Sequence, residues 1–162
     1  MGHFGGLCGD SFMATLGKPF YTGLFRHGLD DKNRLTIPSA WRAAHASDDA
    51  FLAVPNPAGF ITVLPPAEVE KLYAKVAEVP MGDLEAQRDI AGFFAVAQAF
   101  SFDKQGRVAL SDELRARAGI TKDAVMSGIL SKFNIYSPAK WDELAAATSP
   151  ASQAGFMSRF GI

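Results

Sequence analysis

The sequence is poor in cysteine, carries almost no net charge and contains no long apolar run. Its single cysteine, Cys8, excludes an intramolecular disulfide framework and a cysteine-based zinc site, and it fits a reducing cytoplasm. The longest mostly apolar stretch, residues 91–97, is far shorter than the roughly 20 residues that span a bilayer. We therefore expect no membrane partner and no disulfide-stabilised scaffold.

The charge balance limits the classes of nucleic-acid-binding protein that fit. Lysine and arginine number 16 against 17 aspartate and glutamate residues, which gives a net charge of −1. This excludes a protein held on nucleic acid by bulk positive charge alone, but a local basic patch is compatible with it. With 48% hydrophobic and 20% charged residues, the 162 residues suit one globular domain or two small ones that share a core.

The sequence also lacks the common signatures of an active site. It contains no phosphate-binding loop, nucleophile elbow, paired carboxylates or metal-ligand set at a telling spacing. His27 and His45 have no matching acidic or cysteine partners in the sequence, so we expect neither to be a metal ligand or general base. We predict a protein without enzyme activity, metal or cofactor. An enzyme stays open as an alternative, because small duplicated β folds do host catalysis.

What the sequence does contain is an internal repeat. Residues 29–42 read LDDKNRLTIPSAWR, and residues 102–115 read FDKQGRVALSDELR. At an offset of 73, the matching charged pairs are Asp30 and Asp103, Arg34 and Arg107, and Arg42 and Arg115. At an offset of 72, Pro66, Val69 and Leu72 match Pro138, Trp141 and Leu144. Two copies of one small unit explain this match better than chance does.

Each copy has the pattern of a strand, a tight turn, a return strand and a short helix. Strands are predicted at 21–29, 97–102, 35–37, 108–110, 51–54, 60–64, 124–129 and 133–136. Asn33 and Gly106 precede the arginines and tolerate a positive φ, which predicts a tight turn at each place. Short helices are predicted to begin at residues 38–39 and after Ser111, the second ending at Gly119, and longer helices at 66–79 and 83–96.

This order predicts an α+β protein. We expect two tandem β-rich units packed as a pseudo-symmetric small barrel with peripheral helices. The predicted segments are a flexible N-terminal extension (1–19), a first unit (20–72), a linking helical segment (73–96), a second unit (97–147) and a C-terminal tail (148–162). The tail is rich in serine, alanine and glycine and is expected to be loose, although its phenylalanines could dock onto another surface.

The duplicated strand, Asp/Arg turn, return strand and helix resemble the MraZ family. These are bacterial regulators of the cell-division and cell-wall gene cluster, built from two tandem SpoVT/AbrB-like units. Residues 29–38, 102–107 and 136–141 carry the resemblance together with Arg42 and Arg115, and it covers roughly residues 20–147. The chain departs from the family pattern in its N-terminal extension, in Asn33 where glycine is usual, and in Ser111 where proline is usual.

The resemblance implies a sequence-specific DNA-binding regulator, a repressor that also acts on its own operon. It implies a ring-shaped homo-oligomer that docks on tandem repeats of double-stranded DNA in its own upstream region. It also implies a cytoplasmic, nucleoid-associated protein. The charge distribution supports this, because residues 26–42 and 103–117 carry a net charge of +3 and the rest of the chain −4. Positive charge is therefore concentrated where the motif lies.

Six residues are the candidate DNA-binding and turn-fixing positions. We expect Arg34 and Arg107 to reach base edges in the major groove, because the fork of an arginine matches the O6 and N7 acceptors of guanine. Lys32 and Lys104 would contact phosphates as point charges. Asp30 and Asp103 would fix each turn, by accepting backbone N–H bonds or by orienting the arginine.

Simpler interpretations stay open for these residues and for the whole chain. Each Asp–Arg pair can be an ion pair that only pins its turn, and Arg42 and Arg115 are better explained by a structural role than by base contacts. The main alternative function is an AbrB-like antitoxin-type protein whose principal partner is another protein. A purely structural ring without a DNA role is a further alternative, and the basic motif segments count against it.

Overall fold

Residues 18–162 are described by a computed structural model and form eight strands and six helices, in one element order that occurs twice. The first pass contains β1 (Leu24–Gly28), β2 (Arg34–Thr36), α2 (Ser39–Arg42), β3 (Phe51–Asn56), β4 (Phe60–Leu64), α3 (Pro66–Ala77) and α4 (Leu84–Phe94). The second contains β5 (Gln98–Phe100), β6 (Arg107–Ala109), α5 (Asp112–Ala118), β7 (Asp123–Gly128), β8 (Phe133–Tyr136), α6 (Pro138–Ala147) and α7 (Pro150–Phe160). The repeat of the sequence is thus a repeat of structure. Most of the expected N-terminal extension, including Cys8, lies outside the described residues.

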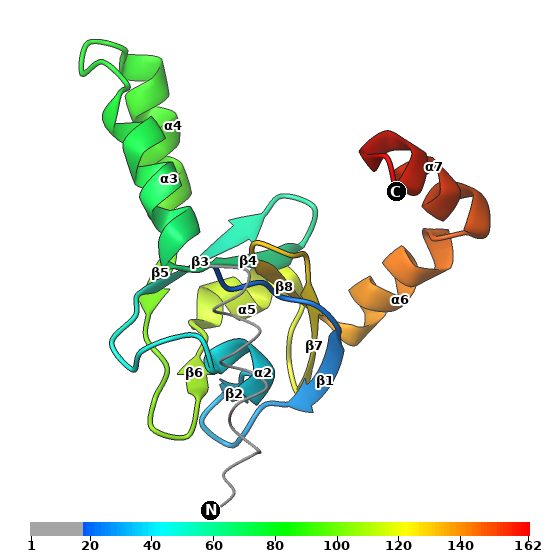
Figure 1. Ribbon diagram of the computed structural model, residues 1–162. Coiled ribbons are helices and arrows are strands. Elements are labelled where there is room, and N and C mark those ends of the chain that lie inside the picture. The colour runs from blue at the N-terminus through cyan, green and yellow to red at the C-terminus, as the bar shows by residue number, and fades with distance from the viewer. Residues whose placement is uncertain (1–17) are drawn as a thin grey trace, which may run out of the picture.

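The two passes exchange their first strands. Six antiparallel strands form one sheet in the order β1-β7-β8-β4-β3-β5, and β2 pairs with β6 in a separate two-stranded ladder (Figure 1). β1 of the first pass pairs with β7 of the second, and β5 of the second pass pairs with β3 of the first. Neither half can complete its sheet alone, so the two passes share one core.

An approximate twofold axis relates the two passes. Thr62 of β4 lies opposite Asn134 of β8, its repeat equivalent, and the Thr62 hydroxyl donates to the Asn134 side-chain oxygen at 2.8 Å. In the second ladder, Leu35 lies opposite its equivalent Val108. In each ladder, a residue that faces its own equivalent marks where the axis passes. Both motif copies therefore converge on one place in the molecule.

The core lies between the six-stranded sheet, the β2–β6 ladder and the two short helices. Its buried residues come from both passes and include Leu35, Ile37, Trp41, Phe51, Ile61, Val63, Val108, Leu114, Met126, Phe133 and Ile135. The ring of Trp41 packs against those of Tyr21, Phe25 and Phe133 at centroid distances of 4.8–5.8 Å. Trp41 is thus an aromatic anchor of the core.

The helix ends follow the local signals of the sequence. Ser111 caps α5 by accepting a hydrogen bond from the Leu114 N–H, and the helix ends at Gly119, whose φ is +66°. Ser137 caps α6 in the same way through the Lys140 N–H. Pro66 and Pro138 occupy the first positions of α3 and α6, where no N–H is needed.

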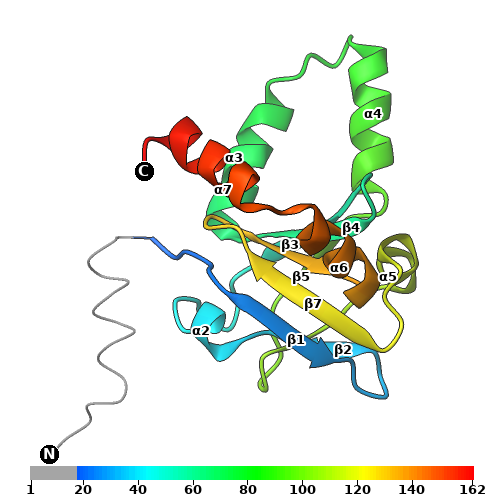
Figure 2. The same cartoon turned by 90° about the vertical axis from the view of Figure 1, so that its right-hand side faces the viewer.

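Two helical arms extend from the body. α3 and α4 form a hairpin on one side, and α6 and α7 leave from another (Figures 1 and 2). None of these four helices contains a fully buried residue. The prediction of a loose tail from residue 148 was wrong, because residues 150–160 form the helix α7. A capping box between Ser149 and Ser152 begins this helix. Among residues 18–162, no helix has the length and apolar character needed to cross a bilayer.

The predicted α+β class is confirmed, with helices around a mostly antiparallel sheet. The strands of the described residues form an open sheet and a separate ladder, and no closed barrel is found among them. The predicted strands and the helices at 66–79 and 83–96 all occur, and their ends lie within three residues of the expected ones.

Candidate functional site

The first motif forms a turn around one aspartate. Asp30 Oδ1 accepts hydrogen bonds from the backbone N–H groups of Lys32 at 3.0 Å and Arg34 at 2.8 Å. Its second oxygen, Oδ2, accepts from Arg34 Nε at 2.7 Å. Asn33 precedes the arginine with a φ of +59°, and its N–H donates to the Asp30 carbonyl at 3.0 Å. The carboxylate thus fixes both the turn and the direction of the Arg34 side chain.

The second motif repeats this geometry almost bond for bond. Asp103 Oδ1 accepts from the backbone N–H groups of Gln105 at 2.9 Å and Arg107 at 2.8 Å, and Oδ2 accepts from Arg107 Nε at 2.8 Å. Gly106 takes the position of Asn33 with a φ of +74°. Only glycine and a few short polar residues adopt this φ readily, which explains both residue choices.

The β2–β6 ladder places the two turns on one surface. Leu35 and Val108 point into the core, so their neighbours Arg34 and Arg107 point outward on the same face. Arg34 lies opposite Ala109, two residues along β6 from Arg107, which makes the two arginines diagonal neighbours. Arg107 Nη1 lies 3.7 Å from Asp30 Oδ2, so the second motif contacts the first. We call Asp30, Arg34, Asp103 and Arg107 the paired-turn site.

The surroundings of the paired-turn site favour the charged form of both its carboxylates. The backbone N–H of Arg34 is the largest cause that lowers the pKa of Asp30 below its ordinary value of 3.8; partial desolvation opposes it, and the Arg34 guanidinium and the Lys32 N–H add to it. The pKa of Asp103 is lowered in the same way, with the hydrogen bond from the Arg107 backbone N–H as the largest cause. The four side chains are between 25% and 35% exposed, so their free edges stay open to a ligand.

Lys32 and Lys104, the predicted phosphate contacts, occupy exposed positions within the two turns. No ion pair of either lysine with a described residue is found, in contrast to both arginines. Each turn therefore presents one arginine held by a carboxylate and one lysine that protrudes into solvent. A fixed arginine fork beside an exposed lysine charge is chemically able to contact an anionic group such as a phosphate.

Arg42 and Arg115 have structural contacts. Arg42 Nε donates to the Ile37 carbonyl at 2.8 Å, and Arg115 Nε donates to the Leu110 carbonyl at 3.3 Å. Arg115 also pairs with the exposed Asp112. These contacts agree with the structural role that their positions on the short helices suggest.

Two glutamines that the sequence did not single out support the site. Gln105 Oε1 accepts from Arg107 Nη2 at 3.0 Å, and the Gln98 side chain donates to the Ala109 carbonyl at 2.7 Å and accepts from the Ser111 N–H at 2.8 Å. The one signal that could have pointed to Gln98 is Ser111, since a residue with an N–H in place of proline needs an acceptor there.

His45 lies in a hydrogen-bonded chain away from the paired-turn site. Its Nε2 and the Tyr21 hydroxyl are 2.5 Å apart, and its Nδ1 lies 2.9 Å from Asp49 Oδ2. Burial raises the pKa of the Tyr21 phenol, with the Asp49 charge as a smaller cause. The chain ties the segment before β1 to the loop after α2. Within residues 18–162 no three His, Cys, Asp or Glu side chains are placed to hold a metal ion.

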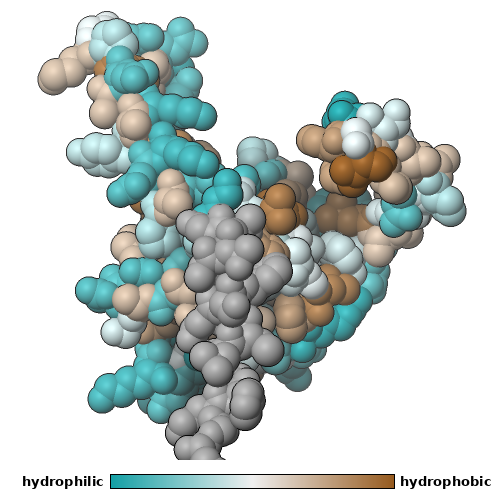
Figure 3. Space-filling view, viewed as in Figure 1, coloured by the Kyte–Doolittle hydropathy of each residue, from teal (hydrophilic) through white to brown (hydrophobic). Residues whose placement is uncertain are grey.

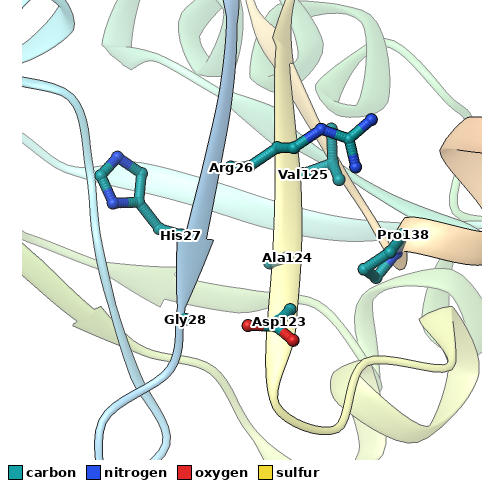
Figure 4. Close-up of a pocket in the computed structure, with 7 residues that line it drawn as sticks. All are labelled: Arg26, His27, Gly28, Asp123, Ala124, Val125 and Pro138. Carbon is teal, nitrogen blue, oxygen red and sulfur yellow. The ribbon is translucent and has the colours of Figure 1, made fainter.

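A pocket of about 310 Å³ lies beside β1, β7 and the start of α6 (Figure 4). Its lining residues are Arg26, His27, Gly28, Asp123, Ala124, Val125 and Pro138. Arg26 points toward Pro138 and pairs with Asp142 at 3.5 Å, whereas His27 points to the other side of β1. None of the paired-turn residues lines this pocket, so it is separate from the motif.

Comparison with known proteins gives consistent matches. Residues 93–158 match a family model described as "MraZ protein, putative antitoxin-like". A relative from Thermomicrobium roseum named "Transcriptional regulator MraZ" is 34% identical over 134 residues, which is 81% of this chain and 93% of that protein. Proteins of the same name from Clostridium tetani and Syntrophobacter fumaroxidans are each 32% identical, covering 88% and 78% of this chain and 99% and 85% of the relatives.

Proposed function

The chain belongs to the MraZ family, and from this premise we propose that it is a transcriptional regulator that binds DNA sequence-specifically through the paired-turn site. In this proposal it represses transcription, including that of its own operon in the cell-division and cell-wall cluster. Its operator consists of tandem repeats upstream of its own gene, and the protein acts at the nucleoid. The family is one of regulators rather than enzymes.

One observation carries the proposal: two arginines on one exposed face, each held by a carboxylate that also fixes its turn. Arg34, which Asp30 holds through Nε, has no protein partner on either Nη group within residues 18–162, which suits contact with the O6 and N7 edge of guanine. Lys32 and Lys104 flank this fork and would contact phosphates. Asp30 and Asp103 would stay on the protein side of the interface, as the residues that position the arginines.

The proposed oligomer is a ring whose subunits bind successive repeats. A protomer of net charge −1 binds DNA weakly by itself, and several linked protomers raise the effective concentration of each site on its repeat. The tandem units 20–72 and 97–147 would each supply one turn, while residues 73–96 and 148–162 would supply contacts between subunits. Exposed apolar side chains on the arms support this division, among them Tyr73, Leu84, Phe156 and Phe160. Figure 3 shows hydrophobic surface on the α7 arm.

A salt titration of binding tests the proposal. The probe is a duplex that carries the tandem repeats upstream of the gene, compared with a scrambled duplex of equal length. Wild type should prefer the repeats, and its affinity should fall steeply with salt. Arg34→Ala should lose about 1–3 kcal/mol of the preference, because one base-reading fork is gone. Lys132→Ala removes the same charge from the turn between β7 and β8, at the end of β7 away from the paired-turn site, and should keep the preference.

Each other outcome has a definite meaning. Equal affinity of wild type for both duplexes at every salt concentration would contradict the DNA-binding proposal and favour the antitoxin-type alternative, in which another protein is the main partner. An equal loss for Arg34→Ala and Lys132→Ala would mean that Arg34 contributes charge without reading sequence.

A further inference from the structure

The two motif copies differ in what lies behind each turn. Arg42 and Arg115 are repeat equivalents, and both use Nε to hold a carbonyl five residues earlier. The rest of the Arg115 guanidinium pairs with Asp112, on its own helix. The Arg42 guanidinium instead lies directly against Gly106: a Cβ placed on that glycine would be 2.3 Å from Arg42 Cζ and Nη1. Arg42 therefore reaches from the first repeat into the turn of the second.

Gly106 is held from two directions by the first repeat. Its carbonyl accepts a hydrogen bond from the Ile37 N–H at 2.9 Å, and its Cα faces the Arg42 guanidinium. The equivalent residue of the first turn, Asn33, carries a side chain of its own, so it has a Cβ where Gly106 leaves room for a guanidinium. The second turn is thus clamped, and the first turn has no matching clamp among the described residues.

The arginines that follow these turns differ in the same direction. Arg107 is engaged at all three guanidinium nitrogens, with Asp103 at 2.8 Å, Gln105 at 3.0 Å and Asp30 at 3.7 Å. Arg34 is held only through Nε, by Asp30 at 2.7 Å, and within residues 18–162 its two Nη groups have no hydrogen-bond or ion-pair partner. Arg34 can therefore offer a bidentate fork to a base without breaking a protein contact, and Arg107 cannot.

We propose that Arg42 is a positioning residue that fixes the second turn, so that Arg107 presents a rigid positive charge to the phosphate backbone while Arg34 discriminates between base pairs. This inference rests on the proposed DNA-binding function and assigns base recognition to the first motif and phosphate contact to the second. It goes beyond equal roles for the two arginines, which the near-identical turns alone would suggest.

Charge-preserving substitutions test the division of roles. A lysine keeps the positive charge but loses the planar fork, so it impairs base readout more than phosphate contact. Arg34→Lys should lower the preference for the repeat duplex over the scrambled duplex by about thirtyfold, the middle of the range for a bidentate base contact, with the salt slope unchanged. Arg107→Lys should leave this preference within about twofold of wild type. Equal effects of the two substitutions in a protein that binds the repeats would overturn the division.

A double-mutant cycle tests the clamp without any DNA. Gly106→Ala places a Cβ on the Arg42 guanidinium, and Arg42→Ala removes that obstacle. We expect Gly106→Ala to destabilise the wild-type chain more than it destabilises the Arg42→Ala chain, measured by urea unfolding. Gly59→Ala is the matched control, because Gly59 also has a positive φ, +93°, but nothing within 4 Å of the added Cβ. Additive effects of the Gly106 and Arg42 substitutions would overturn the clamp.

Binding measurements then separate a positioning role from a merely structural one. Arg42→Ala should weaken binding to the repeat and scrambled duplexes by the same factor, because it displaces Arg107 from phosphates that both duplexes share. Arg42→Lys should restore part of the lost affinity. Arg115→Ala removes the equivalent arginine and should leave both affinities unchanged. A loss for Arg115→Ala equal to that for Arg42→Ala would contradict the positioning role. Failure of wild type to bind DNA would overturn the proposed function but not the clamp, which the unfolding cycle measures by itself.

Discussion

Asp30 and Asp103 each accept hydrogen bonds from two backbone N–H groups and one guanidinium, which makes each carboxylate the centre of its turn. Both pKa values are lowered in the folded state. A lowered folded-state pKa means that the carboxylate stabilises the fold above its ordinary pKa of 3.8, and that this stabilisation is lost as the pH falls through the folded-state pKa. The turns should therefore loosen in acid and not in base.

A substitution at the second turn makes this measurable. Asp103→Asn should lower the melting temperature at neutral pH by a few degrees at most, because the group is exposed. The gap from wild type should close as the pH is lowered from 3.8 through the folded-state pKa, and thermal unfolding followed by circular dichroism would record it. Asp31→Asn, an exposed neighbour of the first turn, is the control and should show no such gap. A gap for Asp103→Asn that persists at the lowest pH would contradict the linkage.

At the residue scale the sequence predicts part of the site. The spacing Asp-x-x-x-Arg, with a residue that tolerates positive φ before the arginine, predicts both turns because all its hydrogen bonds are local. The contact of Arg42 with Gly106 joins residues 64 positions apart, and no local pattern encodes it. The contact of Arg107 with Asp30 likewise joins residues 77 positions apart, because the pairing of β2 with β6 brings the two turns together. The hydrogen bonds within each turn can therefore be predicted from the sequence, whereas the contacts between the two repeats cannot.

Among the elements, β5 and β6 show how one repeat compensates for a lost proline. In the first repeat, Pro38 has no N–H, and Phe25 packs on the Trp41 ring. At the equivalent positions of the second repeat, Ser111 has an N–H that needs a partner, and Gln98 supplies the acceptor at 2.8 Å while donating to the Ala109 carbonyl. The second repeat thus has glutamine in place of Phe25 and serine in place of Pro38, and the Gln98 side-chain amide couples these two differences.

This coupling predicts the result of a double-mutant cycle. Gln98→Ala should lower the free energy of unfolding by about 1–2 kcal/mol, because two hydrogen bonds of modest net strength are lost. In a Ser111→Pro background the loss should be about half as large, since one of the two bonds is already absent. Ser111 has a φ of −63°, which proline also adopts, so the background variant should fold. Urea unfolding measures all four proteins, and equal losses in the two backgrounds would contradict the coupling.

The elements themselves are more predictable than their pairing. Pro66, Ser111 and Gly119 mark helix ends by local geometry, and the structure confirms each of them. The exchange of β1 and β5 between the repeats is not predictable from local patterns. The alternation of apolar residues shows which face of a strand is buried, but it does not show which strand pairs with it. α7 was missed because five of its eleven residues are serine, alanine or glycine, a composition typical of a loose tail, although Ser149 and Gly161 provide a cap at each end.

On the scale of the whole molecule, the twofold relation breaks down in the arms. Six residues, 78–83, separate α3 from α4, which lets α4 fold back as a hairpin, whereas only residues 148–149 separate α6 from α7. At an offset of 66, Gln87, Ile90 and Phe94 of α4 correspond to Gln153, Phe156 and Phe160 of α7. Ile90 and Phe94 are half-buried, and Phe156 and Phe160 are 57% and 61% exposed. The same apolar face is thus partly covered in the first repeat and open in the second.

The open face predicts where self-association is sensitive to mutation. Phe156, Met157 and Phe160 lie on one side of α7, so Phe156→Asp combined with Phe160→Asp places two charges there. Because α7 has no buried residue, the far-ultraviolet spectrum and the melting temperature should stay close to wild type. If α7 contributes to the proposed ring, the mass measured by light scattering should fall toward the 17.3 kDa of one chain. Ser158→Asp, a charge on the opposite side of the same helix, should leave the mass unchanged. An unchanged mass for the double variant, or an equal fall for Ser158→Asp, would mean that subunits meet without the phenylalanine face of α7.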